Sequence, residues 1–460
     1  MKKLIPFLFL TACYTGPIQP TPPDPITPDL ILLKGETSEI RVASGCPTLT
    51  PPAGLSIELF EYKSVTTTHP SYIGATIGAQ KDALVPCVIG LEGAWIDVTA
   101  ARDATPGVYK LGAYNVLVLN AALPTQPTMP FYGEIVSATV WQLENIPDDG
   151  QHNMQKAQAI KDWSTFLRKH RIEPIKQWIK TYSPSNLESD PAPGADFLSV
   201  IVKDAIAPPM LVRYESTSTP SVASLQALEA AIQSGKIPSS AWGYVRDEGQ
   251  LGPDGKTSQP NLAALLQKSA LYRQYAPSMK QYSTWVEIPE LAPLDGTWPV
   301  AEWFLDPRFT VPYTKPYGLY VGCMSQGRCA PGPASNPTGT PLMVLDSPEI
   351  HQMIFPVMAY ALGAQRAMYY RLDKKIKTAF QLDGQYDEGG HGDGTMLYYQ
   401  GGPQASARLK AIRYGSNSVE YLKLLGEDGH DLVQDTRHWI KDKTLLNNLR
   451  NKLAKKLGAI

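Results

Sequence analysis

The sequence predicts an all-β sandwich followed by an α/β domain with the architecture of a (β/α)8 TIM-like barrel. Short apolar segments separated by Gly and Pro turns fill residues 30–130, a pattern typical of a β-sandwich. From residue 131 to residue 460, apolar strands alternate with long helices, which favours parallel βαβ units. We count eight strands in this second part, the number that a (β/α)8 barrel requires. A chain of 460 residues is long enough for both domains.

The N-terminal residues 1–12 resemble a bacterial lipoprotein signal peptide. Lys2 and Lys3 precede an apolar stretch at residues 4–10, and the sequence LTAC then ends at Cys13. Such a lipobox implies cleavage before Cys13 and a lipid on its thiol, which would anchor the chain to a membrane of the cell envelope, at the outer membrane or cell surface. An ordinary signal peptide with an incidental cysteine is the alternative. The Pro-rich residues 13–29 favour an extended tether.

Four further cysteines suit an oxidising compartment. The domain division pairs Cys46 with Cys87 and Cys323 with Cys329; free buried thiols are the alternative, because connectivity does not follow from sequence. No histidine shares the cysteine spacing, so we expect no metal site and no cofactor.

The overall charge argues against a nucleic-acid partner. The net charge is −1, and no basic stripe is interleaved with aromatic residues. Beyond the N-terminus, the apolar residues 354–364 are too few to cross a membrane and predict a core helix.

The sandwich is expected to hold no catalytic residue. Its turn at residues 104–107 (ATPG) combines a Pro that presets φ with a Gly that supplies a positive one. The predicted sandwich strands are residues 39–42, 55–62, 94–98, 108–111 and 115–119.

The α/β part is predicted to place eight strands and four long helices in alternation. The strands are residues 134–141, 173–179, 196–202, 242–246, 281–288, 299–304, 318–322 and 367–372, and the helices are residues 155–170, 221–234, 261–275 and 347–362. A helix is missing from residues 180–195, and residues 208–216 are a possible extra strand, so the count is uncertain by one.

The chemistry of the chain is expected at the end of the strand at residues 242–246. Trp242 suits a buried strand, whereas Asp247 and Glu248 are costly to bury and therefore mark its open end. Active sites of (β/α)8 barrels lie at the C-terminal ends of their strands. A surface turn with two solvated acids is the alternative.

Two adjacent carboxylates favour one kind of glycoside hydrolysis. Neighbouring strand residues point to opposite faces, so the two acids share a site only if the backbone turns, which Gly249 permits. They are too near in sequence to flank a glycosidic bond from two strands. The pair fits substrate-assisted hydrolysis, in which an acetamido group of the substrate is the nucleophile.

Several motifs resemble glycoside hydrolase family 123, the β-N-acetylgalactosaminidase family. They are AWIDV at residues 94–98, DATPGVY at 103–109, FLRKHRIEP at 166–174, GDGTMLYY at 392–399, and RLKAIRYG at 408–415 with EYL at 420–422. The resemblance implies that Asp247 orients the acetamido group and that Glu248 is the general acid/base.

The resemblance also suggests residues that bind the sugar, each with a structural alternative. Trp285 and Trp303 are candidates for stacking on the sugar or for the barrel core. Tyr244 and Tyr320 offer hydroxyls or core packing, and His391 and Asp393 either close the pocket or form a tight turn.

The chain departs from the family near the expected barrel mouth. Gly249 stands where the family has proline, and residues 368–373 (MYYRLD) replace a strand with tryptophan and asparagine. Asn417 and Ser418 replace an acidic pair, and Gln400 replaces a proline. The expected function is therefore hydrolysis of a β-N-acetylhexosaminide, with a non-catalytic glycan-binding or structural lipoprotein as the alternative.

Overall fold

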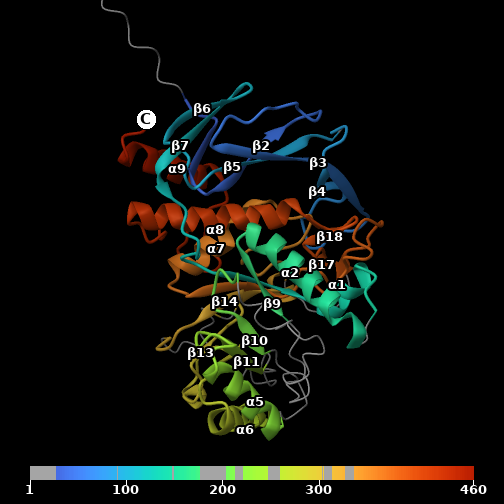
Figure 1. Cartoon of the computed structure of the whole chain (residues 1–460), viewed down its shortest axis with the longest axis vertical. Coiled ribbons are helices and arrows are strands. Elements are labelled where there is room, and N and C mark those ends of the chain that lie inside the picture. The colour runs from blue at the N-terminus through green and yellow to red at the C-terminus, as the bar shows by residue number, and fades with distance from the viewer. Residues whose placement is uncertain are drawn as a thin grey trace, which may run out of the picture.

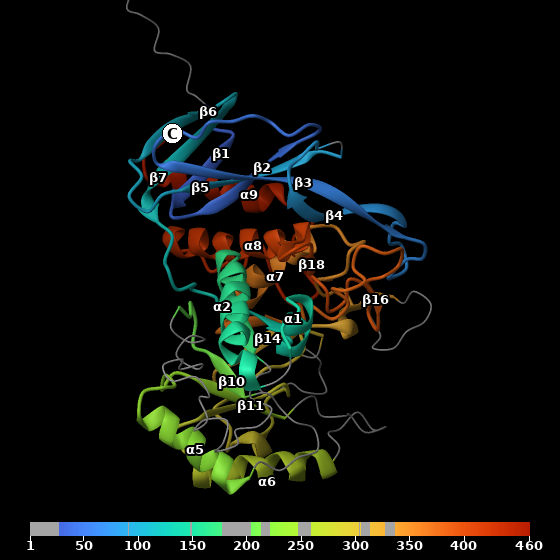
Figure 2. The same ribbon diagram turned by 45° about the vertical axis from the view of Figure 1, so that its right-hand side comes forward.

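The computed structural model describes residues 27–90, 92–147, 150–176, 204–212, 221–246, 259–302, 304, 313–326 and 336–460. A β-sandwich lies at one end of the molecule and helices α5 and α6 lie at the other. Helix α8 crosses the middle, between the sandwich and the parallel strands (Figures 1 and 2).

Seven strands form the sandwich. A three-stranded sheet has the order β1 (Leu30–Lys34), β7 (Tyr114–Ala122), β6 (Gly107–Leu111), and a four-stranded sheet has the order β2 (Thr37–Val42), β5 (Ala94–Ala100), β3 (Leu55–Thr67), β4 (Gly78–Pro86). Leu32, Ile96 and Val116 belong to the apolar cluster between them. Gly107 has φ 143°, as its turn requires. The predicted strands correspond to β2, β3, β5, β6 and β7, whereas β1 and β4 were not predicted.

The predicted disulfide between Cys46 and Cys87 is confirmed, with an S–S distance of 1.98 Å. Cys323 is also disulfide-bonded. Its predicted partner Cys329 lies outside the described residues, so that pairing remains a prediction.

Two four-stranded parallel sheets make up the second part. Their strand orders are β10–β11–β12–β13 and β14–β15–β8–β9. The strands are β8 (Phe131–Ile135), β9 (Ile172–Lys176), β10 (Met210–Val212), β11 (Trp242–Arg246), β12 (Lys280–Ser283), β13 (Gly296–Thr297), β14 (Gly318–Val321) and β15 (Arg366–Tyr369). Parallel bridges from Thr297 to Tyr317 and from Val300 to Tyr320 join the β13 and β14 edges.

The fold-class prediction is therefore confirmed only in part. The chain is mixed α/β with parallel strands behind a β-sandwich, but a closed barrel is not shown, because no pairing between β9 and β10 is present among the described residues. The predicted strand at residues 196–202 falls in the stretch that is not described. The possible extra strand at residues 208–216 is present as β10.

One predicted strand is largely wrong. Residues 134–141 were expected to be extended, but β8 ends at Ile135 and helix α1 (Ser137–Leu143) follows. Asp373 accepts a hydrogen bond from the amide of Val136 at 2.9 Å, and the Val140 side chain is buried in the core. Tertiary contacts thus override the strand propensity of this β-branched segment. In the predicted strand at residues 299–304, the described residues 299–302 and 304 form no strand beyond the bridge at Val300.

The long helices occur close to the predicted ranges. They are α2 (Asn153–Lys169), α5 (Val222–Gln233), α6 (Gln259–Tyr275) and α7 (Ile350–Ala361). The described residues also form helices α8 (Ala407–Leu425) and α9 (Thr444–Lys456) and the hairpins β16–β17 (Tyr386–Asp387, Gly390–His391) and β18–β19 (Leu397–Tyr399, Pro403–Ala405). None of the described helices is long and apolar enough to cross a membrane.

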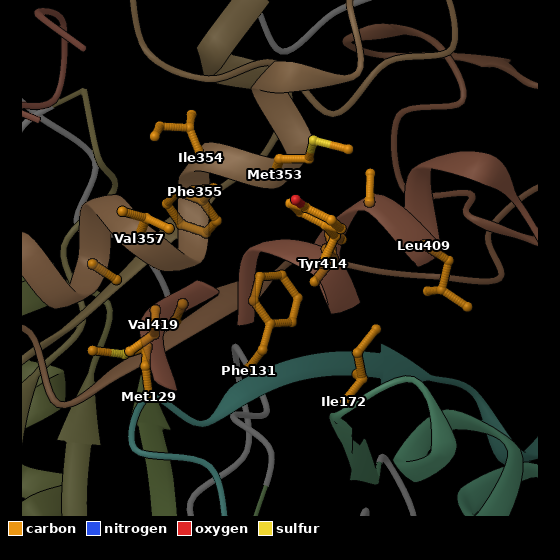
Figure 3. Packing of buried hydrophobic residues seen from close by; sticks show 14 of the residues in the cluster. Met129, Phe131, Ile172, Met353, Ile354, Phe355, Val357, Leu409, Tyr414 and Val419 are labelled. Atoms are coloured by element: carbon orange, nitrogen blue, oxygen red, sulfur yellow. The ribbon is translucent and has the colours of Figure 1, made fainter. Parts of the chain in front are cut away.

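The main core lies where α7 and α8 cover the parallel strands. Figure 3 shows Phe131 of β8 close to Phe355 of α7, whose ring centroids are 6.1 Å apart. At the helix crossing, a Cβ on Gly415 would lie 2.0 Å from the carbonyl oxygen of Met353. Only glycine allows the two helices to approach this closely.

Candidate functional site

The interior side of the parallel strands is filled by an aromatic layer. Trp242 lies at its centre, with its ring centroid 4.6 Å from that of Trp298 and 5.2 Å from that of Tyr282. The Arg366 guanidinium lies over these rings, 4.7 Å from Tyr282. The layer consists of Tyr132, Ile175, Ala207, Trp242, Tyr282, Trp298, Val300, Tyr320 and Met368. It forms an apolar layer that is shared by both parallel sheets.

Other residues follow the aromatic layer along the strands, toward the C-terminal ends of these strands. Because side chains alternate along a strand, Glu134 lies on the same face of β8 as Tyr132, two residues earlier. Thr284 comes directly after β12, and Tyr370 comes directly after β15. Glu134 and Thr284 are buried and Tyr370 is partly exposed. The C-terminal ends of the parallel strands, called this edge below, are the candidate active site.

The two predicted catalytic acids follow strand β11 in the chain. Strand β11 has the predicted bounds, Trp242–Arg246, and it is parallel to β10 and β12. Asp247 and Glu248 come directly after its C-terminal residue but lie outside the described residues. Their roles therefore remain predictions.

The structure adds buried carboxylates that the sequence analysis did not select. Glu287, which follows β12, accepts hydrogen bonds from the amide and the hydroxyl of Thr314. Glu302 accepts one from the Thr340 hydroxyl at 3.1 Å. Asp373, after β15, pairs with Arg371 at 2.7 Å. The sequence analysis missed Glu134 because it took residue 134 as the start of a strand, whereas β8 ends at Ile135. The alternation of side chains along the strand from Tyr132 is the signal that identifies it.

Burial raises the pKa of Asp373 above its ordinary value, although Arg371 and the Val136 amide oppose the shift. Its contacts join the ends of β8 and β15. Asp373 is fully buried, so a positioning role for these strand ends fits it better than contact with a ligand.

The predicted sugar-binding aromatic residues are mostly buried. Trp285 is 3% exposed and packs in the cluster beneath α5 and α6. Tyr320 is 5% exposed and belongs to the aromatic layer. Tyr244 is in β11, but its side chain is not described, and Trp303 falls outside the described residues. The structure thus favours core packing for Trp285 and Tyr320.

His391 and Asp393 lie in the segment after β15 and are nearly inaccessible. The Asp393 carboxylate accepts a hydrogen bond from the Gly389 amide at 3.1 Å and one from the Tyr369 hydroxyl at 3.3 Å. Gly390 has φ 116°, and Gly392 and Gly394, on either side of Asp393, also have positive φ. Burial raises the pKa of Asp393 to about 6. These contacts favour the tight-turn alternative.

Several residues of the family-like motifs are found at the sandwich interface. Asp97 of β5 pairs with Lys410 and Arg413 of α8 at 3.0 and 2.7 Å. On the same helix, Arg408 pairs with Asp82 of β4 at 2.9 Å. Further buried pairs join Glu36 with Arg450 and Arg171 with Glu420. The motif charges therefore fix the sandwich to α8.

A cavity of about 350 Å³ also lies at this interface. Arg41, Tyr62, Glu349 and Gln352 are among its lining residues, and none of the described lining residues belongs to strands β8 to β15. It is therefore separate from the strand ends.

Comparison with known proteins gives an informative match among solved structures. No protein-family model and no curated protein match the chain. Among solved structures, it is similar to a family 123 glycoside hydrolase from Clostridium perfringens that hydrolyses glycolipid glycans, with 11% identity over 93% of each chain and a TM-score of 0.60.

Structures with much lower TM-scores do not support an inference about this chain. A family 39 glycoside hydrolase from the gut symbiont Bacteroides cellulosilyticus has a TM-score of 0.29 and 9% identity, over 86% of this chain and 82% of that one. The family 123 likeness shows a shared fold over nearly the whole chain. The resemblance that the motifs predicted is thus confirmed at the level of the fold.

Proposed function

We propose that this protein is a glycoside hydrolase that acts on a β-N-acetylhexosaminide, with an N-acetylgalactosaminide as the preferred substrate. The observation that carries the proposal is the fold shared with a family 123 glycoside hydrolase over 93% of both chains. The Asp247–Glu248 pair follows the C-terminal end of a parallel strand, where such a fold places its chemistry.

In this proposal the two acids have different roles. Asp247 orients the substrate's acetamido group and stabilises the positive charge that develops as its oxygen attacks the anomeric carbon. Glu248 protonates the leaving oxygen and afterwards accepts a proton from water. Two neighbouring carboxylates suit this division, because like charges push their pKa values apart.

The described edge offers suitable surroundings for a sugar. Tyr370 is partly exposed at the end of β15 and provides an aromatic face. Glu134 and Thr284 supply polar groups above the aromatic layer. Because β15 differs from the family pattern, the residues of this strand end are the ones that we expect to set the sugar preference.

The test compares aryl N-acetyl-β-galactosaminides and glucosaminides whose leaving groups differ in acidity. With a poor leaving group, Glu248→Gln should lower kcat/KM by about 10²- to 10⁴-fold, the usual contribution of general acid catalysis. A dinitrophenyl leaving group needs no protonation. With this substrate, Glu248→Gln should lower the rate of the cyclisation step, in which the acetamido oxygen attacks the anomeric carbon, by a much smaller factor. Asp247→Asn should lower the rate for both substrates.

Glu290→Gln is the matched control, because Glu290 is an exposed glutamate in the turn after β12. Its activity should equal that of the parent. Full activity of Glu248→Gln on the poor leaving group would refute the role of this residue.

The alternative is a glycan-binding or structural protein without turnover. The sequence differences at residues 368–373, at the end of β15, favour it. Binding of an N-acetylhexosaminide with no hydrolysis across the substrate panel would select the binding function. We also propose that Cys13 carries a lipid and holds the protein at the cell envelope, on the basis of the lipobox-like residues 10–13.

A further inference from the structure

Two histidines and an aspartate meet where the sandwich contacts the segment after β15. His69 lies in the loop between β3 and β4, whereas Asp383 and His391 lie between β15 and β18. Their ligand atoms all lie within 4.8 Å of one another. Nε2 of His391 is 3.4 Å from Oδ1 of Asp383, and Nδ1 of His69 is 3.8 Å from Oδ2 of Asp383.

These separations are close to those of ligands around one metal ion. Imidazole nitrogens and carboxylate oxygens lie about 2.0–2.2 Å from Zn²⁺ in a tetrahedral site, so neighbouring ligand atoms are about 3.3–3.5 Å apart. The pair of His391 and Asp383 already has this spacing, and Nδ1 of His69, which is 3.8 Å from Oδ2 of Asp383, would move closer when an ion binds. Two imidazoles and a carboxylate select a first-row transition metal rather than Mg²⁺ or Ca²⁺.

The surroundings hold the carboxylate in position. Thr68 donates hydrogen bonds from its amide to Oδ1 of Asp383 at 2.8 Å and from its hydroxyl to Oδ2. Outer hydrogen bonds of this kind orient metal ligands in proteins.

The imidazole rings are also held in place. Tyr386 packs edge-on against both, with ring centroids 4.5 Å from His69 and 4.9 Å from His391. Ser71 fixes the His391 backbone by accepting its amide hydrogen bond at 2.8 Å. The site therefore requires little ordering of side chains when an ion binds.

The proton on His391 has a defined place. Nε2 lies 3.0 Å from the His69 carbonyl oxygen and donates to it in the metal-free protein. Nδ1 is buried and has no hydrogen-bond partner among the described residues. When Nε2 binds a metal, the proton moves to Nδ1 or to solvent.

We propose that His69, Asp383 and His391 bind one Zn²⁺ ion, or a similar divalent transition metal, that fastens the sandwich to the segment after β15. The His69 side chain is 45% exposed, so solvent completes the coordination. Asp393 belongs to the same segment, and the ion would hold it against the ends of the strands. The role is structural and lies outside the proposed hydrolysis.

The test is metal binding by the full chain in detergent after chelator treatment. Calorimetric titration with ZnCl2 should give one site per chain. Titration with CoCl2 should produce the intense visible absorption of four-coordinate cobalt. Zinc should also raise the melting temperature of the parent. His69→Ala should weaken zinc binding by on the order of 100-fold, since even outer-sphere changes cost about 10- to 100-fold, and should abolish the zinc-dependent rise in melting temperature.

Two variants keep the test decisive. His69 is half-exposed, so its removal leaves the metal-free fold intact, which circular dichroism checks. His438→Ala is the control, because His438 is exposed and pairs with Asp435 at 2.6 Å but has no third ligand among the described residues. It should bind zinc like the parent. No stoichiometric binding by the parent, or binding unchanged by His69→Ala, would overturn the site whether or not the protein hydrolyses glycosides.

Discussion

The buried carboxylate of Asp97 offers a sharp test of what joins the sandwich to α8. Its Oδ1 accepts a hydrogen bond from Arg413 at 2.7 Å and one from the Trp95 indole at 2.8 Å, and its Oδ2 accepts bonds from Lys410 and Arg413, each at 3.0 Å. Burial by itself would raise the pKa of Asp97, but Arg413 and Lys410 hold it well below its usual range. The substitution Asp97→Asn leaves both cations buried with weaker partners.

The two sides of this cluster should respond differently. Breaking a buried ion pair by removing one partner costs about 3–5 kcal/mol, and we expect a cost in this range for Asp97→Asn. Lys410→Met should change the free energy of unfolding by less than about 1.5 kcal/mol, because Arg413 still pairs with Asp97 and the thioether packs against Phe60 and Trp95.

The pKa of Lys410 explains this asymmetry. Burial lowers it from 10.5 to about 8 even with Asp97 present, which corresponds to a net cost of about 3 kcal/mol for the charged form. Since the folded pKa is below the unfolded one, the unfolded chain binds more protons between pH 8 and 10.5. Stability conferred by this group therefore rises with pH across that window, and Lys410→Met should remove the rise.

The assay is equilibrium urea unfolding of the full chain, followed by tryptophan fluorescence and far-ultraviolet circular dichroism. Trp95 of the sandwich contributes to the fluorescence of the nine tryptophans, and agreement of the two signals tests two-state behaviour. Equal destabilisation by Asp97→Asn and Lys410→Met, or a cost below about 1 kcal/mol for Asp97→Asn, would refute the argument, since such values are those of an exposed pair.

Two other predictions concern Asp393 and the N-terminus. Burial raises the pKa of Asp393 from 3.8 to about 6, so the folded protein holds an extra proton between these values and stability falls as pH rises through the window, by up to about 3 kcal/mol. Asp393→Asn should flatten this dependence in urea unfolding between pH 4 and 7; an unchanged profile would contradict the assignment. Cys13→Ser should move the protein from the membrane fraction to the soluble fraction when cells are fractionated, and retention on membranes would contradict lipid anchoring.

Local patterns determined much of the fold. The bounds of β11 were predicted without error, because a short apolar run that ends in charged residues is decided by its own composition. The turn at residues 104–107 and the helices α2, α5, α6 and α7 follow from similarly local signals. Residues 134–141 failed because their β-branched composition suits a strand, whereas a hydrogen bond from Val136 to Asp373 and the burial of Val140 favour helix α1. No pattern within the segment reveals those partners.

By itself, the sequence identified charged side chains within or next to apolar segments. They include the adjacent acids Asp247 and Glu248 and the charges of AWIDV and RLKAIRYG. Only the tertiary structure decided what the motif charges contact: Asp97 pairs with Lys410 and Arg413 across the sandwich interface. The cluster of His69, Asp383 and His391 was hidden for the same reason, since His69 and His391 are 322 residues apart in the chain. Hydrophobic patterns are local and can be read along the sequence, but ion pairs and metal ligands form between distant segments, and their partners are known only once the chain has folded.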